Sequence, residues 1–340
     1  MSATTHRIGR DAIHTYWSNA LEPRLWVQPG ETVVVETVDC NHGQVAREID
    51  TITRNEIAPD LRDLIAAAAY PEPPVVGRDP SITGGHPLTG PIGVEGAEPG
   101  DTLVVEVLEI VPGAWGWNAC SSNPDSLGLL NDDIGDTNGR IHHIYDLRNG
   151  VTTEFAPGIR IPISPFPGVI GVAPAEPGQL STIPPRRNGG NMDLRHITAG
   201  STLYLPVLAP GALLSMGDCH AAQGDGEVTG TGIEMDATLT LRLRLIKGRQ
   251  FRQPSLTTAA DKPLSIPGPA YVATGHNPDV REAAREALSG VLDYLTAHHG
   301  LTRPEAYMLA SVVVDLKISQ IVDRPNWTVG AYLPLAIFAE

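Results

Sequence analysis

Three times in this chain, a turn sequence leads directly into a run of β-branched and apolar residues. The segments are PGETVVVETVD (29–39), PGDTLVVEVLEI (99–110) and AGSTLYLPV (199–207). Glycine accepts turn dihedral angles and proline fixes the direction of approach, so each segment predicts a turn followed by a β-strand. The first two segments are 70 residues apart. The two segments are similar turn–strand units but do not indicate a solenoid, because no shorter repeat period connects them.

The strongest strand pattern is the alternation in ATLTLRLRLI (237–246). Leucines recur at every second position, while threonine and arginine fill the positions between them. Successive side chains of a strand point to opposite faces, so this pattern predicts a strand with one buried and one solvated face. Shorter apolar runs predict further strands at 168–174 and 211–217.

Helical patterns are fewer than strand patterns. Helices are predicted at 60–70, at 277–300 between a cap at Asn277 or Asp279 and a stop at Gly300, and within 302–323. We therefore predict an α+β fold: a β-rich body of short strands, sandwich-like or barrel-like, with helices concentrated in the C-terminal quarter. The chain is expected to form a single unit over 1–340, with a division into a β-rich 1–275 and a helical 276–340 as the alternative.

Charge and cysteine content restrict the partners and the compartment. The formal net charge is −15 at pH 7, whereas binding to nucleic acid requires an excess of lysine and arginine. The N-terminus lacks the apolar core of a secretory signal, and no window of 18 apolar residues predicts a membrane span. Three cysteines without metal-finger spacing fit reduced thiols in the cytoplasm. We expect no nucleic-acid or membrane partner.

The stretch SMGDCHAAQGDGEVTGTGIEMD (215–236) concentrates the residues that could carry chemistry. In an extended segment, Asp218 and His220 point to the same face and form half of a metal site. Glu227 and Glu234 could act as metal ligands or as a general base. The alternative for the whole stretch is a hydrogen-bonded turn that continues into a solvated hairpin. Cys219 is an unfavourable nucleophile partner for His220, because adjacent residues of an extended segment point apart.

Two shorter motifs add acidic residues. GGNMD (189–193) is typical of a tight turn that presents Asp193. In VVVETVDCNHGQ, Asp39 ends a row of apolar side chains on one strand face. Such a carboxylate lies either at the exposed end of the strand or at the mouth of a pocket.

Four long motifs, taken together, resemble the acetamidase/formamidase family of metal-associated amide hydrolases. They are HPLTGPIGVEGAEPGDTLVVEV (86–107), GGNMDLRHITAGSTLYLPV (189–207), GALLSMGDCHAAQGDGEVTGTGIE (211–234) and AYMLASVVVDLKISQIVD (306–323), in family order. The resemblance implies a β-rich α+β fold and hydrolysis of short aliphatic amides to acid and ammonia. It also implies a divalent metal, zinc by expectation, a small-molecule amide as substrate, and a homo-oligomer such as a dimer.

The resemblance also implies roles for nine side chains. Those expected at or beside the metal are Asp39, Asp193, Asp218 and His220. Those expected to contact substrate are Asn191, Gln223 and Asp225. Glu234 is favoured near the metal as base or ligand, with Glu227 as the supporting acid, because Gly230 and Gly232 can bend the strand between them.

The chemistry explains why such residues are needed. An amide is a poor electrophile with a poor leaving group, so a metal that polarises its carbonyl and a carboxylate that moves protons both lower the barrier. Two alternatives stay open: a non-catalytic metal- or ligand-binding β protein on the same scaffold, and a hydrolase of a larger amide or cyclic imide. The segment 277–323 is expected to serve packing or an oligomer interface rather than chemistry.

Overall fold

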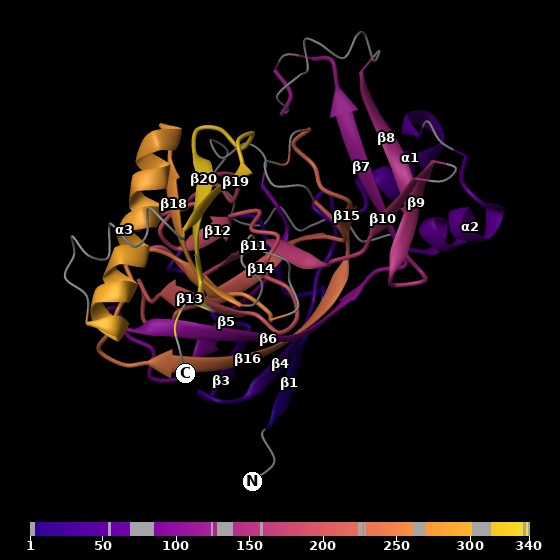
Figure 1. Ribbon diagram of the computed structural model, residues 1–340. Coiled ribbons are helices and arrows are strands. Elements are labelled where there is room, and N and C mark those ends of the chain that lie inside the picture. Colours follow the sequence, from indigo (N-terminus) through magenta and orange to yellow (C-terminus); the bar gives the residue numbers. More distant parts are fainter. Residues whose placement is uncertain are drawn as a thin grey trace.

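A computed structural model gives the structure of the chain (Figure 1). It describes residues 4–53, 56–68, 85–123, 125–127, 139–156, 159–223, 227, 229–260, 269–300, 314–335 and 338. Within these ranges the protein is mostly β-sheet, with two large sheets, one separate hairpin and three helices.

The first sheet has nine strands and is mostly antiparallel. In spatial order its strands are β1 (Thr5–Ile8), β4 (Thr32–Glu36), β16 (Ala237–Ile246), β6 (Thr102–Pro112), β13 (Thr202–Pro206), β17 (Ser255–Thr257), β18 (Ala270–Asn277), β20 (Trp327–Pro334) and β19 (Asp315–Gln320). The edge strands β1 and β19 do not pair with each other in the described residues, so this sheet stays open rather than closing into a barrel.

The predicted turn–strand segments are confirmed, and they lie together. They form β4, β6 and β13, and the alternating segment forms β16, which pairs with β4 on one side and β6 on the other. Strand β13 pairs with the outer side of β6. The four strongest strand patterns of the sequence thus build four consecutive strands of one sheet.

The second sheet carries most of the site. Its main path is β12 (Gly189–Asn191), β11 (Phe166–Gly171), β14 (Leu214–His220), β15 (Glu234–Met235), β7 (Trp115–Ser121) and β8 (Arg140–Asp146). Strand β5 (Leu88–Val94) branches from β14, and β2 (Ile13–His14) and β3 (Leu25–Val27) pair with β5. A separate hairpin is formed by β9 (Thr152–Ala156) and β10 (Ile159–Pro162).

The main hydrophobic core lies between the two sheets. It joins buried side chains of β4, β6, β13 and β16 with those of β5, β11 and β14, such as Leu241 from the first sheet and Ile92, Ile170 and Met216 from the second. All four are fully buried. Burial of apolar surface between the sheets is the main contribution that holds them face to face.

The three helices cover separate places. The longest, α3 (Val280–His299), packs on β18 and β20 through a cluster that includes Ala287, Val291 and Leu295. Its ends are as predicted: the Asp279 carboxylate accepts backbone hydrogen bonds at the N-cap, and Gly300 is left-handed with φ 65°. With 20 residues, α3 exceeds the combined length of α1 (Gln44–Ile52) and α2 (Pro59–Ala67), which pack near β7 and β8.

The predicted helix within 302–323 is wrong where it can be tested. Residues 301–313 lie outside the described residues, but Asp315–Gln320 is strand β19, paired antiparallel with β20. A run that is apolar on every side fits a strand as well as a helix, and pairing with β20 decides the outcome. Leu316 and Ile318 are exposed on this strand rather than buried in a helix.

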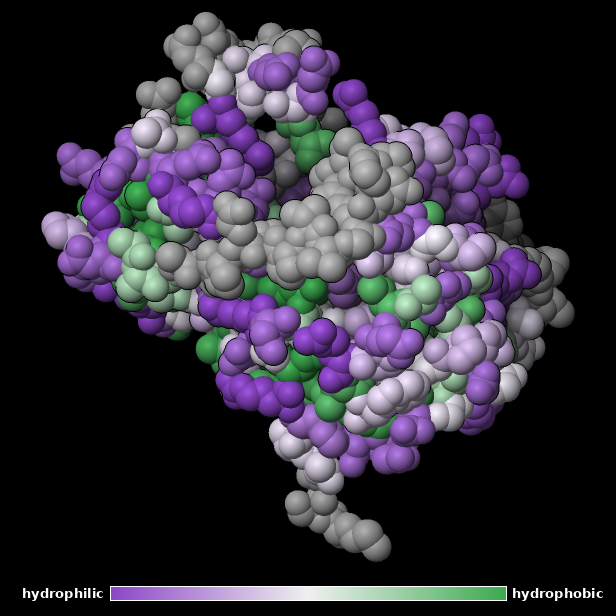
Figure 2. All heavy atoms as spheres, turned by 180° about the vertical axis from the view of Figure 1, so that it is seen from behind, coloured by the Kyte–Doolittle hydropathy of each residue, from purple (hydrophilic) through white to green (hydrophobic). Residues whose placement is uncertain are grey.

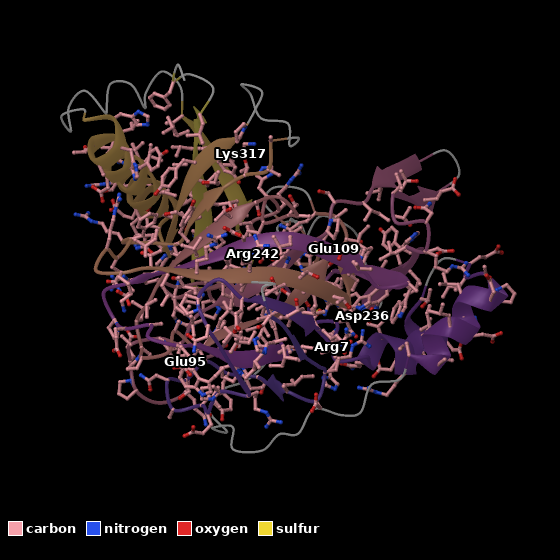
Figure 3. All side chains as sticks on the ribbon, turned by 90° about the horizontal axis from the view of Figure 1, so that it is seen from below. Arg7, Glu95, Glu109, Asp236, Arg242 and Lys317 are labelled. Carbon is pink, nitrogen blue, oxygen red and sulfur yellow. The ribbon has the colours of Figure 1, made fainter. Side chains whose placement is uncertain are left out.

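The surface agrees with the acidic, polar composition. Hydrophilic residues predominate on the face shown in Figure 2, and the hydrophobic residues among them form small scattered groups. Among the described residues, no helix combines the length and hydropathy that a membrane span requires. Figure 3 shows charged side chains, including Arg242 and Glu109, along the β16–β6 pair.

The alternation of β16 yields a stability prediction. Leu241 is fully buried between the sheets, so Leu241→Ala should lower the free energy of unfolding by about 2–5 kcal/mol through lost burial and a cavity. Urea denaturation measures this loss. Arg244 lies on the solvated face and pairs with Glu106 at 3.0 Å, with its side chain 53% exposed. As the control, Arg244→Ala should cost less than about 1 kcal/mol. Equal losses for the two variants would contradict the assignment of the two faces.

Candidate active site

Strand β14 delivers two of the predicted residues to one place. Asp218 and His220 converge on the same side, with 3.5 Å between Asp218 Oδ1 and His220 Nε2. Cys219 points the other way into the main core, as expected for alternating side chains. Burial raises the pKa of its thiol to about 12, which makes Cys219 a poor nucleophile.

The neighbouring strands complete the surroundings of His220. In the β14–β15 pairing His220 lies opposite Glu234, whose Oε2 is 3.1 Å from His220 Nε2. In the β14–β11 pairing it lies opposite Phe166, whose ring meets the imidazole edge-on at 5.2 Å between centroids. The imidazole is therefore fixed between a carboxylate and an aromatic ring, and it is completely buried.

Gln223 fixes Nδ1 of His220 as a hydrogen-bond donor. Its Nε2 donates to the backbone carbonyl of Asp193 at 3.2 Å, and a carbonyl can only accept. The Oε1 atom must then face His220, where it lies 2.6 Å from Nδ1. Nδ1 is thus the donor, and Nε2 is left to face Asp218 and Glu234.

A second acidic group lies against the same imidazole. Ligand atoms of Asp193, His220 and Glu227 all lie within 4.8 Å of one another, and all three residues are buried. Asp193 Oδ1 is 3.9 Å from His220 Nδ1. Asn191, predicted to bind substrate, donates from Nδ2 to Asp323 Oδ2 at 2.7 Å. The structure thus brings together Asp193, Asp218, His220, Glu227 and Glu234.

Asp323 belongs to the segment 277–323, which was expected to serve packing or an oligomer interface, and it lies in the buried cluster. It is 3% exposed, follows β19, and its carboxylate belongs to the buried cluster through Asn191. Burial raises its pKa to about 6. The backbone NH of Asp323 donates to Gln320 Oε1, which holds the segment after β19 in place.

Two further residues of the cluster were not predicted. Cys40 follows β4 by four residues, and its Sγ lies within 4.8 Å of carboxylate oxygens of Asp218 and Glu234. His86 Nε2 lies 3.9 Å from Asp218 Oδ2. Signals existed for both: His86 begins the motif HPLTGPIG, and Cys40 lies in VDCNHGQ beside Asp39.

Asp39 holds the turn that carries Cys40. Its Oδ1 accepts from the backbone NH of Asn41 at 2.9 Å, and its Oδ2 accepts from that of Gly43 at 2.7 Å. Burial raises its pKa to about 6 even though these amides lower it. Both oxygens are thus engaged with backbone amides of the turn. Asp225, also predicted, lies outside the described residues.

Two glycines let these side chains approach so closely. A Cβ on Gly168 would lie 2.7 Å from Asp193 Oδ1 and 2.9 Å from Asp218 Oδ2. A Cβ on Gly232 would lie 2.6 Å from His220 Nδ1. Real Cβ atoms do not approach other atoms this closely, so both positions require the absence of a side chain.

Burial sets the charge of most of the acids. It raises the pKa of Asp193 and Glu227 well above the ordinary range, and the neighbouring carboxylates, Glu227 for Asp193 and Asp323 for Glu227, raise it further. The pKa of Glu234 is also raised by burial, although His220 opposes the shift. Without a compensating cation, these groups favour their protonated forms.

Asp218 and His220 behave differently because they are near opposite charges. Burial opposes ionisation of Asp218, but His86 and His220 lower its pKa below the ordinary value. Burial also lowers the pKa of His220, but Glu234 and Asp218 outweigh this and raise it well above 6.5. The pair is held as carboxylate and imidazolium when no metal is present.

Several atoms of the cluster lack hydrogen bonds. Within the described residues, both oxygens of Asp193, Glu234 Oε2 and His220 Nε2 are buried without a hydrogen-bond partner. Buried carboxylates are normally paired, hydrogen-bonded or bound to a metal. The oxygen, nitrogen and sulfur donors that converge here are also those that zinc accepts. The residues present therefore fit a divalent cation.

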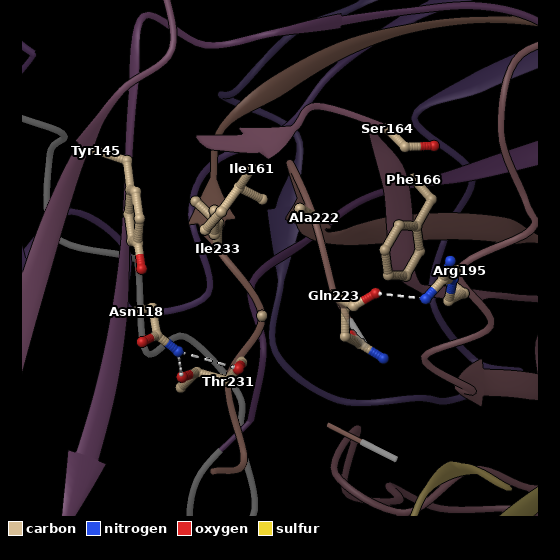
Figure 4. Close-up of a pocket in the computed structure, with 11 residues that line it drawn as sticks. Asn118, Tyr145, Ile161, Ser164, Phe166, Arg195, Ala222, Gln223, Thr231 and Ile233 are labelled. Atoms are coloured by element: carbon tan, nitrogen blue, oxygen red, sulfur yellow. Dashed lines mark hydrogen bonds between the residues drawn. The ribbon is translucent and has the colours of Figure 1, made fainter. Parts of the chain in front are cut away.

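A cavity of about 490 Å³ adjoins this cluster (Figure 4). Phe166, Gln223 and Gly232 line it, and each of them also contacts His220. Arg195 lines the same end and donates to the backbone carbonyl of Gln223 at 3.2 Å. The buried charged groups and an accessible cavity are thus separated by one layer of side chains.

Comparisons with known proteins identify the family of the chain. The model of the acetamidase/formamidase family matches residues 76–179 and 177–340. The chain belongs to the acetamidase/formamidase family. Among its relatives in this family, the formamidase of Methylophilus methylotrophus is 30% identical, with 96% of this chain and 89% of that protein covered. The acetamidase of Mycolicibacterium smegmatis is 27% identical over 87% of this chain and 84% of that protein.

Solved structures agree with this family membership. A predicted acetamidase/formamidase from Thermoanaerobacter tengcongensis has a TM-score of 0.81 and 28% identity, covering 99% of this chain and 97% of that one. An acetamidase from Bacillus halodurans has a TM-score of 0.77 and 31% identity, covering 98% of each chain. A gamma lactamase from Delftia acidovorans has a TM-score of 0.59 and 27% identity, covering 97% and 90%. The predicted family and fold class are confirmed.

The close approach at Gly168 yields a prediction. Gly168→Ala should displace the carboxylates of Asp193 and Asp218, because the new methyl group would overlap both. We expect amide turnover to fall at least about tenfold, since small misplacements of reacting groups cost orders of magnitude. An ammonia-release assay measures the effect. Gly9→Ala is the control, because its methyl group would meet only side-chain oxygens away from the cluster, of Asp11 at 3.1 Å and of Glu36 at 3.6 Å. Unchanged activity in Gly168→Ala would show that the two carboxylates need not converge.

Proposed function

We propose that the chain is an amidohydrolase that cleaves the C–N bond of short aliphatic amides to give a carboxylate and ammonia. The observation that carries this proposal is the buried cluster around His220, several of whose oxygen and nitrogen atoms lack a hydrogen-bond partner among the described residues, beside a cavity. Its relatives bear the names formamidase and acetamidase. Three free cysteines support a reducing, cytoplasmic compartment.

We propose a divalent cation, zinc by preference, as the cofactor. Asp218, His220 through Nε2, and Glu234 would hold it, because these three present atoms to one another at 3.1 and 3.5 Å. Cys40 lies within reach of the same two carboxylates. Three protein ligands leave a fourth position open, as in catalytic zinc sites. When bound, the cation supplies a Lewis acid that polarises the amide carbonyl.

Glu227 is then available for proton transfer. It lies on the cluster beside Asp193 and is not among the three proposed ligands. With the charge of a bound cation offsetting the neighbouring carboxylates, Glu227 would be ionised, and it accepts a proton from a water molecule as the water oxygen bonds to the carbonyl carbon. The proton passes to the amide nitrogen, the C–N bond breaks, and ammonia leaves. This proposal makes Glu234 the ligand and Glu227 the base, a choice that the sequence alone left open.

Matched glutamine substitutions test these roles. Glu227→Gln keeps the shape but removes the base, so kcat should fall by about a hundredfold or more with metal content unchanged. Glu234→Gln should instead lower metal occupancy, because an amide is a weaker ligand than a carboxylate. Ammonia release and elemental analysis measure the two effects. Glu95→Gln, at an exposed position, is the control. Near-normal turnover and metal content in both variants would exclude the two roles.

The raised pKa values of two buried carboxyl groups predict how the stability of the metal-free protein depends on pH. Asp39 and Asp323 have pKa values of about 6 in the folded protein against 3.8 in the unfolded chain. The folded state then holds these protons more tightly, so stability is lost as pH rises through about 6. Between pH 5 and pH 7 the metal-free protein should lose roughly 1 kcal/mol for each such group.

Zinc binding should reverse this trend, because a cation favours the ionised carboxylates. Adding zinc to chelator-treated protein should therefore raise the melting temperature more at pH 7 than at pH 5. Calorimetry with and without chelator measures both arms. A His220→Ala protein serves as the control and should respond little to zinc at either pH. The same zinc response in His220→Ala and in the unaltered chain would place the cation elsewhere.

One observation favours a second candidate function. The gamma lactamase from Delftia acidovorans shares the fold, and the cavity has room for a cyclic amide. Hydrolysis of a simple lactam such as 2-pyrrolidinone breaks the same type of C–N bond without releasing ammonia. A direct comparison of lactam opening with ammonia release from acetamide separates the candidates. A protein that binds zinc but performs neither reaction would be the non-catalytic binder.

A further inference from the structure

The cavity beside His220 is much larger than the smallest amides. A water molecule occupies about 30 Å³ of liquid, so 490 Å³ corresponds to roughly sixteen groups of that size. Formamide and acetamide have only three and four non-hydrogen atoms. Cavities of about 300–1,000 Å³ are typical of sites that enclose considerably larger ligands. A substrate as small as acetamide would leave most of this space to water.

The two ends of the cavity differ in chemistry. Figure 4 shows Gln223 and Arg195 on one side, and Asn118 and Tyr145 on the other. Gln223 contacts the imidazole of His220, so its end is the one next to the charged cluster. Asn118 donates to the Thr231 hydroxyl at 2.9 Å, which fixes the opposite wall. Because Gln223 is the lining side chain nearest to the cluster, the reacting amide group is assigned to the Gln223 end, with the layer of Gln223 and Phe166 between it and the carboxylates.

The walls between these ends are apolar. Ile161, Ala222 and Ile233 line the middle of the cavity, and Figure 4 shows them between Tyr145 and Gln223. Ile233 is buried in the main core, and Ile161 and Ala222 pack against that core. These side chains offer no hydrogen bonds, so the group that best covers them is a hydrocarbon chain.

We propose that the substrate is an aliphatic amide whose acyl chain is longer than acetyl. Its amide group faces Gln223 and the cluster around His220, and its hydrocarbon chain lies along Ile161, Ala222 and Ile233. This inference rests on the proposed amide hydrolysis and specifies its substrate class. The reaction is unchanged: water adds to the carbonyl carbon, the C–N bond breaks, and the nitrogen leaves as ammonia.

Chain length provides the direct test. The zinc-loaded enzyme is assayed for ammonia release from formamide, acetamide, propionamide, butyramide and hexanamide. We expect kcat/KM to rise by about fourfold for each methylene group that becomes buried. A maximum at formamide or acetamide, with a decline at every added carbon, overturns the inference and leaves the proposed amide hydrolysis intact. No ammonia from any of the five amides overturns both.

Substitutions then test where the hydrocarbon chain of the substrate lies in the cavity. Ile161→Phe and Ala222→Leu each place a larger side chain in the middle of the cavity. Two variants are used so that the test still works if one of the variant proteins does not fold. Each is expected to lower the ratio of kcat/KM for hexanamide to that for acetamide by about tenfold. Val151→Phe, at a position 69% exposed outside the cavity, is the matched control and should leave the ratio unchanged. If both cavity variants keep the original ratio and the original melting temperature, the hydrocarbon chain of the substrate does not bind along these residues and the inference is wrong.

Discussion

The burial of several carboxyl groups around one imidazole is the constraint on which the rest of this structure depends. Asp193, Asp218, Glu227, Glu234 and Asp323 are each at most 6% exposed. Removing one ion from water without compensation costs several kcal/mol, more than most single interactions return. Protons or a cation must offset that cost. The raised pKa values of Asp193, Glu227, Glu234 and Asp323 reflect it, because these carboxyl groups hold their protons more tightly than in water. A cluster of this kind persists only on a scaffold that is stable for other reasons.

That scaffold is the pair of sheets, and the alternation of β14 divides its two tasks. Cys219 faces the apolar core between the sheets, while Asp218 and His220 on either side of it face the cluster. The pairing of β14 with β11 and β15 adds Phe166 and Glu234 at fixed positions. The apolar burial that stabilises the protein and the charged groups of the candidate site are thus on opposite faces of one strand.

The site residues that could be predicted from the sequence are those that lie close to one another along the chain. Asp218, His220 and Glu234 lie within 17 residues, and period-two alternation predicts that Asp218 and His220 share a face. Asp323 and His86 join the cluster only through sheet pairing between distant segments, which no local pattern encodes. The helix expected within 302–323 is wrong at Asp315–Gln320 for a related reason. This apolar segment suits a helix or a strand, and its pairing with β20 decides for the strand. Local patterns specified the strands, and tertiary contacts specified which ends of strands meet.

His220 connects the two parts of the site. Its Nδ1 is held by Gln223, which also lines the cavity, and its Nε2 faces Asp218 and Glu234. The backbone carbonyl of Asp193 fixes the orientation of the Gln223 amide, and that orientation fixes the tautomer of His220. A ligand that moves Gln223 must therefore disturb the hydrogen bond that leaves Nε2 free for a cation. In the proposed site, the cavity and the charged cluster are thus linked through a single side chain, Gln223, which touches both.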